Sequence, residues 1–86
     1  SLKLLQDVLK LIQMAGYTIG NIDCMIVAEA PQLAPHIAAM RKNIASALKL
    51  STSQVSVKAT TNEGLDDAGK GLGIWAQAVC LLGTNK

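Results

Sequence analysis

The chain has 86 residues, of which 50% are hydrophobic, 2% aromatic and 16% charged, with a formal net charge of +2. This length allows one domain, the apolar content excludes a disordered chain, and two cysteines are too few for a disulfide-built miniprotein. The sequence contains no run of about 18 apolar residues, which disfavours a membrane span. A single arginine and only two aromatic residues disfavour nucleic-acid binding.

The first element in chain order is a helix. Apolar residues recur at the i, i+3, i+4, i+7 spacing of one helical face, at Leu5, Val8, Leu9 and Ile12. This spacing predicts a helix over residues 2–15, and Gly16 follows where a helix end favours a left-handed residue. Residues 17–28 are rich in β-branched side chains and continuously apolar toward their end, which predicts a strand buried on both faces.

The rest of the chain supplies a second helix and two further strands. Pro35 stands in the first turn of the second helix, which carries Arg41, Lys42 and Lys49 on its polar faces. Alternating apolar and polar residues predict a half-buried strand over 54–59, and residues 74–82 predict a last buried strand, with Trp75 in the core or at an interface. The order α-β-α-β-β predicts an α+β fold, a mixed β-sheet with both helices packed on one face.

The composition also predicts partners. A small domain has a large surface for its volume, and this one has few charges to cover it, so part of its apolar surface would stay exposed on a monomer. Oligomerisation is the simplest expectation, and membership of a longer chain is the alternative. Cys24 and Cys80 lie in apolar segments and are interpreted as small buried side chains in a reducing compartment, with a metal or redox pair as the alternative.

Two loops carry the candidate chemistry. Residues 28–35 are mostly small and apolar, which would leave backbone groups accessible to a flat ligand such as a base; an ordinary strand-to-helix turn is the alternative. Residues 60–73 carry hydroxyls, four glycines, Glu63 and Lys70, which together could contact phosphate oxygens and a divalent cation; a solvated turn is the alternative. His36 is expected to cap or pack, because one histidine alone makes neither a zinc site nor a catalytic dyad.

Four segments together form a specific pattern. They are GYTIGNIDCMIVA at 16–28, AEAPQLAPHIAAMRKNIA at 28–45, VSVKATTNEGL at 55–65 and GIWAQAVCLL at 73–82. This pattern resembles the 2-C-methyl-D-erythritol 2,4-cyclodiphosphate synthase family. The resemblance implies a phosphorus–oxygen lyase that converts 4-diphosphocytidyl-2-C-methyl-D-erythritol 2-phosphate to the cyclic diphosphate and releases CMP, in non-mevalonate isoprenoid biosynthesis. It also implies a homotrimer, in the bacterial cytoplasm or the plastid stroma, that contacts neither membrane nor nucleic acid.

The resemblance assigns roles to residues of both loops. The first loop would bind cytosine through backbone groups of Ala28, Glu29, Ala30, Pro31, Leu33 and Ala34. In the second loop Thr60, Thr61, Glu63 and Lys70 would bind the phosphates, with Thr61 catalytic through its hydroxyl and Glu63 meeting a Mg²⁺ or Mn²⁺ ion. Five positions differ from the residues usual in the family: Gln32, Asp66, Asp67, Lys70 and Leu72.

The family's zinc ligands precede the segment that matches, so the resemblance assigns no zinc ligand to this chain. Residues 1–86 are therefore expected to be a single domain that forms the C-terminal part of a longer synthase. A non-catalytic oligomeric module of the same fold, binding a nucleotide, is the alternative function.

Overall fold

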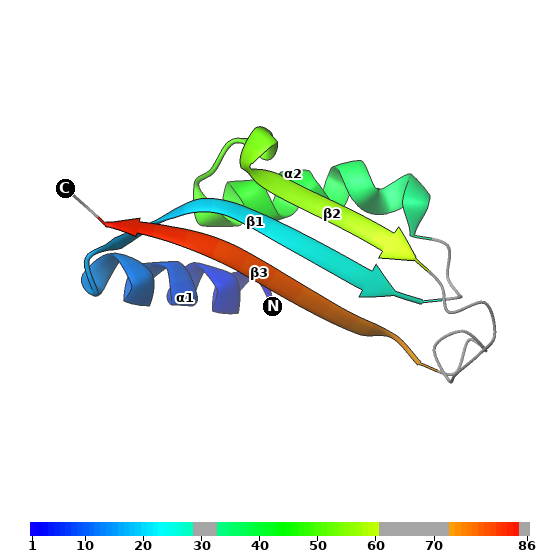
Figure 1. Cartoon of the computed structure of the whole chain (residues 1–86), viewed down its shortest axis with the longest axis horizontal. Helices are drawn as coiled ribbons and strands as arrows, with labels where there is room; N and C mark the ends of the chain where they lie inside the picture. The colour runs from blue at the N-terminus through cyan, green and yellow to red at the C-terminus, as the bar shows by residue number, and fades with distance from the viewer. Residues whose placement is uncertain (29–32, 61–72, 85–86) are drawn as a thin grey trace.

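The computed structural model describes residues 1–28, 33–60 and 73–84 (Figure 1). In chain order the elements are α1 (Leu2–Met14), β1 (Tyr17–Val27), the 3₁₀ turn η1 (Ala34–His36), α2 (Ile37–Leu48), the 3₁₀ turn η2 (Thr52–Gln54), β2 (Val55–Thr60) and β3 (Trp75–Thr84). The predicted order α-β-α-β-β is confirmed. Of the helices in these ranges, none combines the length and the apolar character that a membrane crossing requires.

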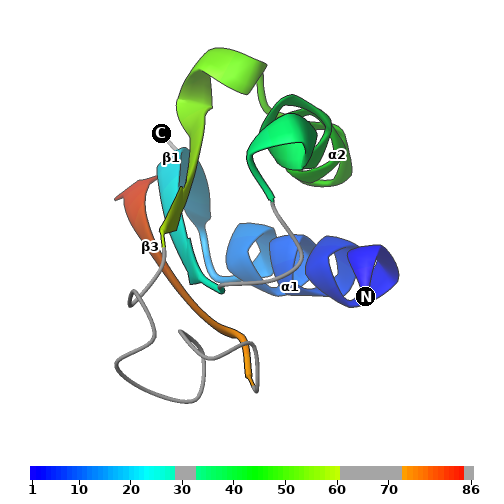
Figure 2. The ribbon, with the colours of Figure 1, turned by 90° about the vertical axis from the view of Figure 1, so that its right-hand side faces the viewer.

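The three strands form one sheet in the order β2-β1-β3. β1 runs parallel to β2 and antiparallel to β3, so the sheet is mixed as predicted. Val27, the last residue of β1, pairs with Thr60 of β2 and with Trp75 of β3. Both helices lie on one face of this sheet, which confirms the predicted layering (Figure 2).

The residues that end the two helices explain where the chain changes direction. Gly16 has a φ of 89°, and its N–H donates a hydrogen bond of 3.0 Å to the carbonyl of Gln13. Because glycine adopts positive φ without a Cβ clash, Gly16 ends α1 and leads into β1, as predicted. α2 ends through Lys49, whose φ of 59° is also left-handed and is uncommon for a residue with a side chain.

The core lies between the sheet and the helices, in two clusters of buried residues. One joins Leu9, Ile19 and Leu48 from α1, β1 and α2, and the other joins Ala45, Val55 and Val57 from α2 and β2. Ile44 and Leu50 pack against both clusters and make the core continuous. The apolar faces of both predicted helices therefore pack against the same face of the sheet.

The prediction that β1 is buried on both faces along its length is wrong. The side chains toward the helices are Ile19, Ile22, Cys24 and Ile26. On the opposite face Asn21 and Asp23 are exposed, and the strand becomes covered only toward Val27. A β-bulge between Ile19 and Asn21 inserts one residue and shifts the inward positions from odd to even numbers, which hides the alternation in the sequence.

The prediction of a buried last strand is also wrong. Every residue of β3 is exposed, and Trp75 is 44% exposed, so Trp75 is not a core residue. β3 lies at the edge of the sheet, while α1 packs on β1 and α2 on β2. Cys80 on β3 is exposed and Cys24 on β1 is only half-buried, so the two thiols are not the buried side chains that were predicted.

Candidate functional site

The two candidate loops begin side by side, although 32 residues of sequence separate Ala28 from Thr60. Parallel strands end at the same edge of a sheet, and β1 and β2 end opposite each other at Val27 and Thr60. The N–H of Ala28 donates a hydrogen bond of 3.0 Å to the carbonyl of Thr60. This bond joins the first residue of one loop to the first residue of the other.

The third strand and the second helix start at the same end of the molecule. Trp75 pairs with Val27, so the chain re-enters the sheet beside the point where β1 and β2 leave it. The start of α2 lies at this end too (Figure 1). The ends of β1 and β2 and the starts of α2 and β3 therefore lie at the same end of the molecule.

Four of the predicted site residues, Ala28, Leu33, Ala34 and Thr60, lie within the described ranges. Ala28 is 7% exposed, Leu33 is half-buried, and Ala34 and Thr60 are exposed. The N–H of Ala28 already donates to the carbonyl of Thr60, so this backbone donor is occupied within the chain. The other predicted residues, Glu29, Ala30, Pro31, Thr61, Glu63 and Lys70, lie outside the described residues.

The start of the second helix differs in one respect from expectation. Pro35 lies in the first turn of η1, which leads directly into α2, so the predicted place of this proline is confirmed. The N–H of His36 donates to the carbonyl of Leu33 at 2.8 Å. The imidazole of His36 is exposed and makes no capping hydrogen bond, so the expectation that it caps or packs is wrong.

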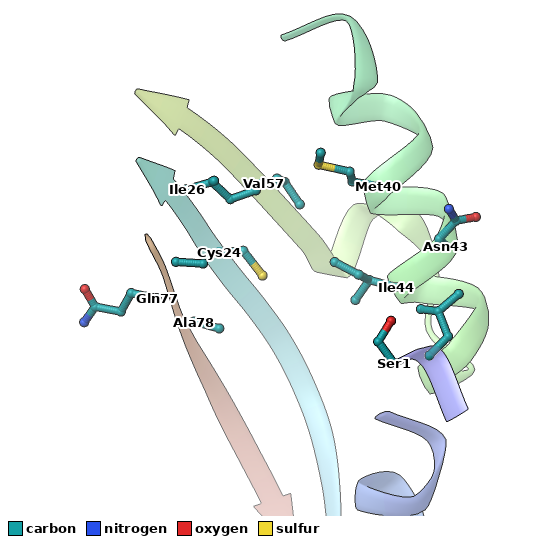
Figure 3. A pocket seen from close by; sticks show the side chains of 11 residues that line it. Ser1, Cys24, Ile26, Met40, Asn43, Ile44, Val57, Gln77 and Ala78 are labelled. Carbon is teal, nitrogen blue, oxygen red and sulfur yellow. The ribbon is translucent and has the colours of Figure 1, made fainter. Parts of the chain in front are cut away.

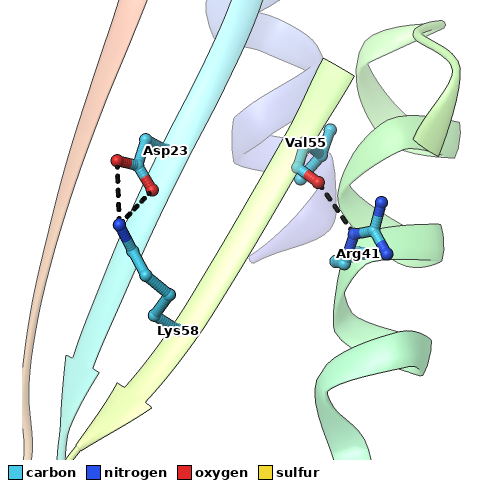
Figure 4. A network of polar contacts seen from close by, with 4 residues as sticks. All are labelled: Asp23, Arg41, Val55 and Lys58. Atoms are coloured by element: carbon cyan, nitrogen blue, oxygen red, sulfur yellow. Dashed lines mark hydrogen bonds and ion pairs between the residues drawn. The ribbon is translucent and has the colours of Figure 1, made fainter. Parts of the chain in front are cut away.

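β2, which leads to Thr60, is held from both faces of the sheet (Figure 4). On the helix side, Arg41 donates from Nε to the carbonyl of Val55 at 2.8 Å and from Nη2 to the carbonyl of Thr52 at 2.7 Å. On the other face, Lys58 pairs with Asp23 of β1 at 3.2 Å. The sequence placed Arg41 only on a polar helix face; its being the single arginine of the chain was the one available signal.

A mostly apolar cavity lies elsewhere. A cavity of about 540 Å³ separates the sheet from α2 and is lined by Cys24, Ile26, Met40, Ile44 and Val57 among others (Figure 3). Asn43, Gln77 and Ser1 are the polar residues of its lining, and it has no charged side chain. Such a lining has no charged side chain to neutralise phosphate, so this cavity is not a candidate phosphate site.

The described part of the chain offers no preformed metal site. Residues 1–28, 33–60 and 73–84 contain no group of three His, Cys, Asp or Glu side chains that could hold a metal ion. Glu63, the residue expected to meet a divalent cation, lies outside these ranges. These residues therefore do not fit a zinc site by themselves.

Comparisons with known proteins agree on one family. The YgbB family, by its sequence model, matches residues 1–83. The 2-C-methyl-D-erythritol 2,4-cyclodiphosphate synthase of Clostridium kluyveri is 59% identical over 85 residues, which are 99% of this chain and 52% of the relative. The chain thus spans about half the length of the curated relatives it matches.

Solved structures give the same result for the fold. The crystal structure of 2C-methyl-D-erythritol 2,4-cyclodiphosphate synthase from Plasmodium vivax superposes with a TM-score of 0.95 at 35% identity, and covers 99% of this chain and 57% of that chain. The CDP complex of IspF from Plasmodium falciparum superposes with a TM-score of 0.93 at 32% identity, and covers 99% of this chain and 55% of that chain.

Proposed function

The chain belongs to the YgbB family, and from this premise we propose that it supplies the cytidine and diphosphate half of a 2-C-methyl-D-erythritol 2,4-cyclodiphosphate synthase. The observation that carries the proposal is the hydrogen bond from Ala28 to Thr60. It brings together the starts of the two loops to which the resemblance assigns cytosine and phosphate binding. Both loops are needed for one substrate that carries a cytidine at one end and phosphates at the other.

The proposed reaction is an intramolecular phosphoryl transfer. An oxygen of the 2-phosphate attacks the β-phosphorus in line, and the bond from the β-phosphorus to the bridging oxygen breaks. CMP leaves with the electron pair of that bond, and the product is the cyclic diphosphate. The enzyme is thereby a phosphorus–oxygen lyase of non-mevalonate isoprenoid biosynthesis.

The described residues contribute orientation. Arg41 holds the start of β2, the Lys58–Asp23 pair holds its middle, and Ala28 holds the carbonyl of Thr60. Loops anchored in this way can position a cytidine and a diphosphate relative to each other before reaction, and such positioning accounts for a large share of catalysis in general. Thr61, adjacent to Thr60 in the chain, is proposed to donate its hydroxyl to the charge that develops on the transferred phosphate.

Divalent cations are a further part of the proposal. We propose Mg²⁺ or Mn²⁺ at the diphosphate, met by Glu63, and Zn²⁺ held by residues outside the described ranges. A bound cation would neutralise charge on the phosphate oxygens. The described residues contain no group of three His, Cys, Asp or Glu side chains that could hold such a cation.

The proposed assembly is a homotrimer in the bacterial cytoplasm, with CMP-type nucleotides as ligands. Large apolar side chains are exposed on β3 and α1, for example Val79, Leu81, Leu4 and Leu11, and burial between copies would cover part of this surface. The CDP complex of the Plasmodium falciparum protein supports a cytidine nucleotide as ligand. The relative from the bacterium Clostridium kluyveri is in keeping with a bacterial cytoplasm, and the plastid stroma is the alternative.

The test is CMP release from the diphosphocytidyl substrate by the full-length natural protein, compared with its Thr61→Ala and Thr61→Ser variants. Loss of one transition-state hydrogen-bond donor lowers kcat by about 10²–10³-fold, and serine, which keeps the hydroxyl, should retain most of the activity. Unchanged turnover in Thr61→Ala would refute the role of Thr61. Binding of CMP without any turnover by the wild-type protein would favour the non-catalytic module instead.

A further inference from the structure

Cys24 and Cys80 occupy neighbouring positions on one face of the sheet. In the antiparallel ladder Cys24 pairs with Ala78, and Cys80 pairs with Ile22, so the two cysteines are diagonal neighbours. Residues two apart on a strand share a face, which places both thiols on the side of the helices. Figure 3 shows the sulfur of Cys24 pointing from β1 toward α2, with Ala78 of β3 on the same side.

The two cysteines also line one cavity. It has a volume of about 230 Å³ and lies between the helices and the β1–β3 pair. Apart from the two thiols, the side chains that line it are all aliphatic, among them Leu5, Val8, Ile19 and Ile44. The only groups in this lining that can bind a metal or an electrophile through a side chain are therefore the two sulfurs.

The diagonal spacing is too wide for a disulfide and suits a bridging metal. Diagonal neighbours across an antiparallel pair lie about 7–8 Å apart at Cα, whereas a disulfide usually requires about 4.4–6.8 Å and a sulfur separation of about 2.05 Å. A metal between two sulfurs holds them roughly 4–5 Å apart, through two bonds of about 2.3 Å each. Rotation about the Cα–Cβ bond of each cysteine can bring the two sulfurs to that separation without moving the strands.

The number and softness of the ligands select the metal. Zinc in a structural site takes four ligands, and this cavity offers two. Thiolates without oxygen or nitrogen partners favour Cu(I) among the biological metals. We propose that Cys24 and Cys80 form a two-thiolate site for a soft monovalent ion, Cu(I), within this aliphatic cavity.

The site is independent of the proposed synthase activity. Cys24 lies three residues before the end of β1, and Cys80 lies five residues beyond the start of β3, on the helix side of the sheet and not at the strand ends. Cys80 is exposed and Cys24 is half-buried, so a Cu(I) donor can reach the site from solvent. Neither thiol forms a disulfide in the structure, so both are available as ligands.

The test titrates Cu(I) into the reduced, metal-free full-length protein in competition with a chromophoric Cu(I) chelator. We expect one Cu(I) per chain, and X-ray absorption should show two sulfur neighbours. Cys80→Ser and Cys24→Ser should each weaken binding by more than about tenfold. Met25→Leu removes a sulfur on the opposite sheet face and should leave the affinity unchanged.

Each of four results would overturn the proposal. They are unchanged affinity in Cys80→Ser, a single sulfur neighbour in the wild type, one Cu(I) shared between two chains, and a disulfide within one chain after treatment with oxidised glutathione. Cys80 is exposed, so its serine variant is expected to fold, and circular dichroism verifies this. The absorption measurement uses the wild-type protein and decides the ligand number even if Cys24→Ser does not fold.

Discussion

Replacing Arg41 by alanine removes the two hydrogen bonds that hold the start of β2 against α2. The bond from Nε to the carbonyl of Val55 is 2.8 Å and partly buried, and the bond from Nη2 to the carbonyl of Thr52 is 2.7 Å and exposed. Val55 itself is 2% exposed. The alanine variant therefore leaves a carbonyl at the edge of the core without its charged donor.

The expected loss follows from these two environments. A hydrogen bond from a charged donor contributes about 1.5–3 kcal/mol, and we assign the exposed bond the smaller contribution of a neutral one, about 0.5–1 kcal/mol. Arg41→Ala should lower the free energy of unfolding by about 2–4 kcal/mol. In a domain of this size each kcal/mol corresponds to about 4–8 °C in Tm.

Urea denaturation followed by circular dichroism measures this loss. Lys42→Ala is the matched control, because Lys42 is the next residue on α2, is exposed, and should change the free energy of unfolding by less than about 0.5 kcal/mol. Arg41→Lys keeps the charge but not the forked donor, so it should recover only part of the loss. If Arg41→Ala is no less stable than Lys42→Ala, β2 is not held by this side chain and the reasoning is refuted.

Three further predictions concern backbone, surface and thiol. Gly16→Ala should destabilise the fold by about 1–2 kcal/mol because alanine is strained at a φ of 89°, although no atom lies within 4 Å of the added Cβ. Lys49→Gly should stabilise the fold by about 0.5–1 kcal/mol, because glycine adopts the positive φ of this position without strain. Thermal melts in which both variants change Tm in the same direction would contradict this argument. Lys58→Ala should cost at most about 0.5 kcal/mol, since the side chains of the Lys58–Asp23 pair are 61% and 54% exposed, and a larger loss that persists in high salt would count against this. Burial, and secondly Asp23, raise the pKa of the Cys24 thiol above its ordinary 9.0, so iodoacetamide should label the exposed Cys80 faster. As pH rises, the Cys24 thiol of the unfolded chain loses its proton before that of the folded chain, so the free energy of unfolding should fall as pH rises from about the ordinary thiol pKa of 9.0. Cys24→Ala should make this pH dependence shallower. A steeper pH dependence in that variant would contradict the direction of the pKa shift.

Local features of the sequence were sufficient for most elements of the fold. The helix expected over 2–15 is observed as Leu2–Met14, and Gly16 has the predicted left-handed conformation. The half-buried strand expected over 54–59 is observed as Val55–Thr60, with Val55 and Val57 buried and Ser56 and Lys58 exposed. These successes share a reason: periodicity and chain conformation are properties of a few neighbouring residues.

The candidate site was predictable only in part. The residue types of the two loops left ordinary turns open, and the base-binding and phosphate-binding roles came from the family resemblance. The proximity of the two loops depends on the register that pairs Val27 with Thr60. The hydrogen bond from the Ala28 N–H to Thr60 and the hydrogen bond from Arg41 to Val55 of β2 are likewise contacts between distant segments. The sequence of either partner does not state which distant atom it contacts, although the single arginine of the chain was a weak signal for Arg41.

The sequence by itself determined the order of the elements, the ends of the helices and the family of the chain, because each rests on residue types and spacing along the chain. The tertiary structure decided which faces are buried and which loops meet. A one-residue bulge after Ile19 reversed the inward face of β1, and a place at the sheet edge left the apolar β3 exposed. An apolar side chain is stabilised by burial, and this is visible in the sequence. Only the packing of the whole chain decides which surface, if any, buries that side chain.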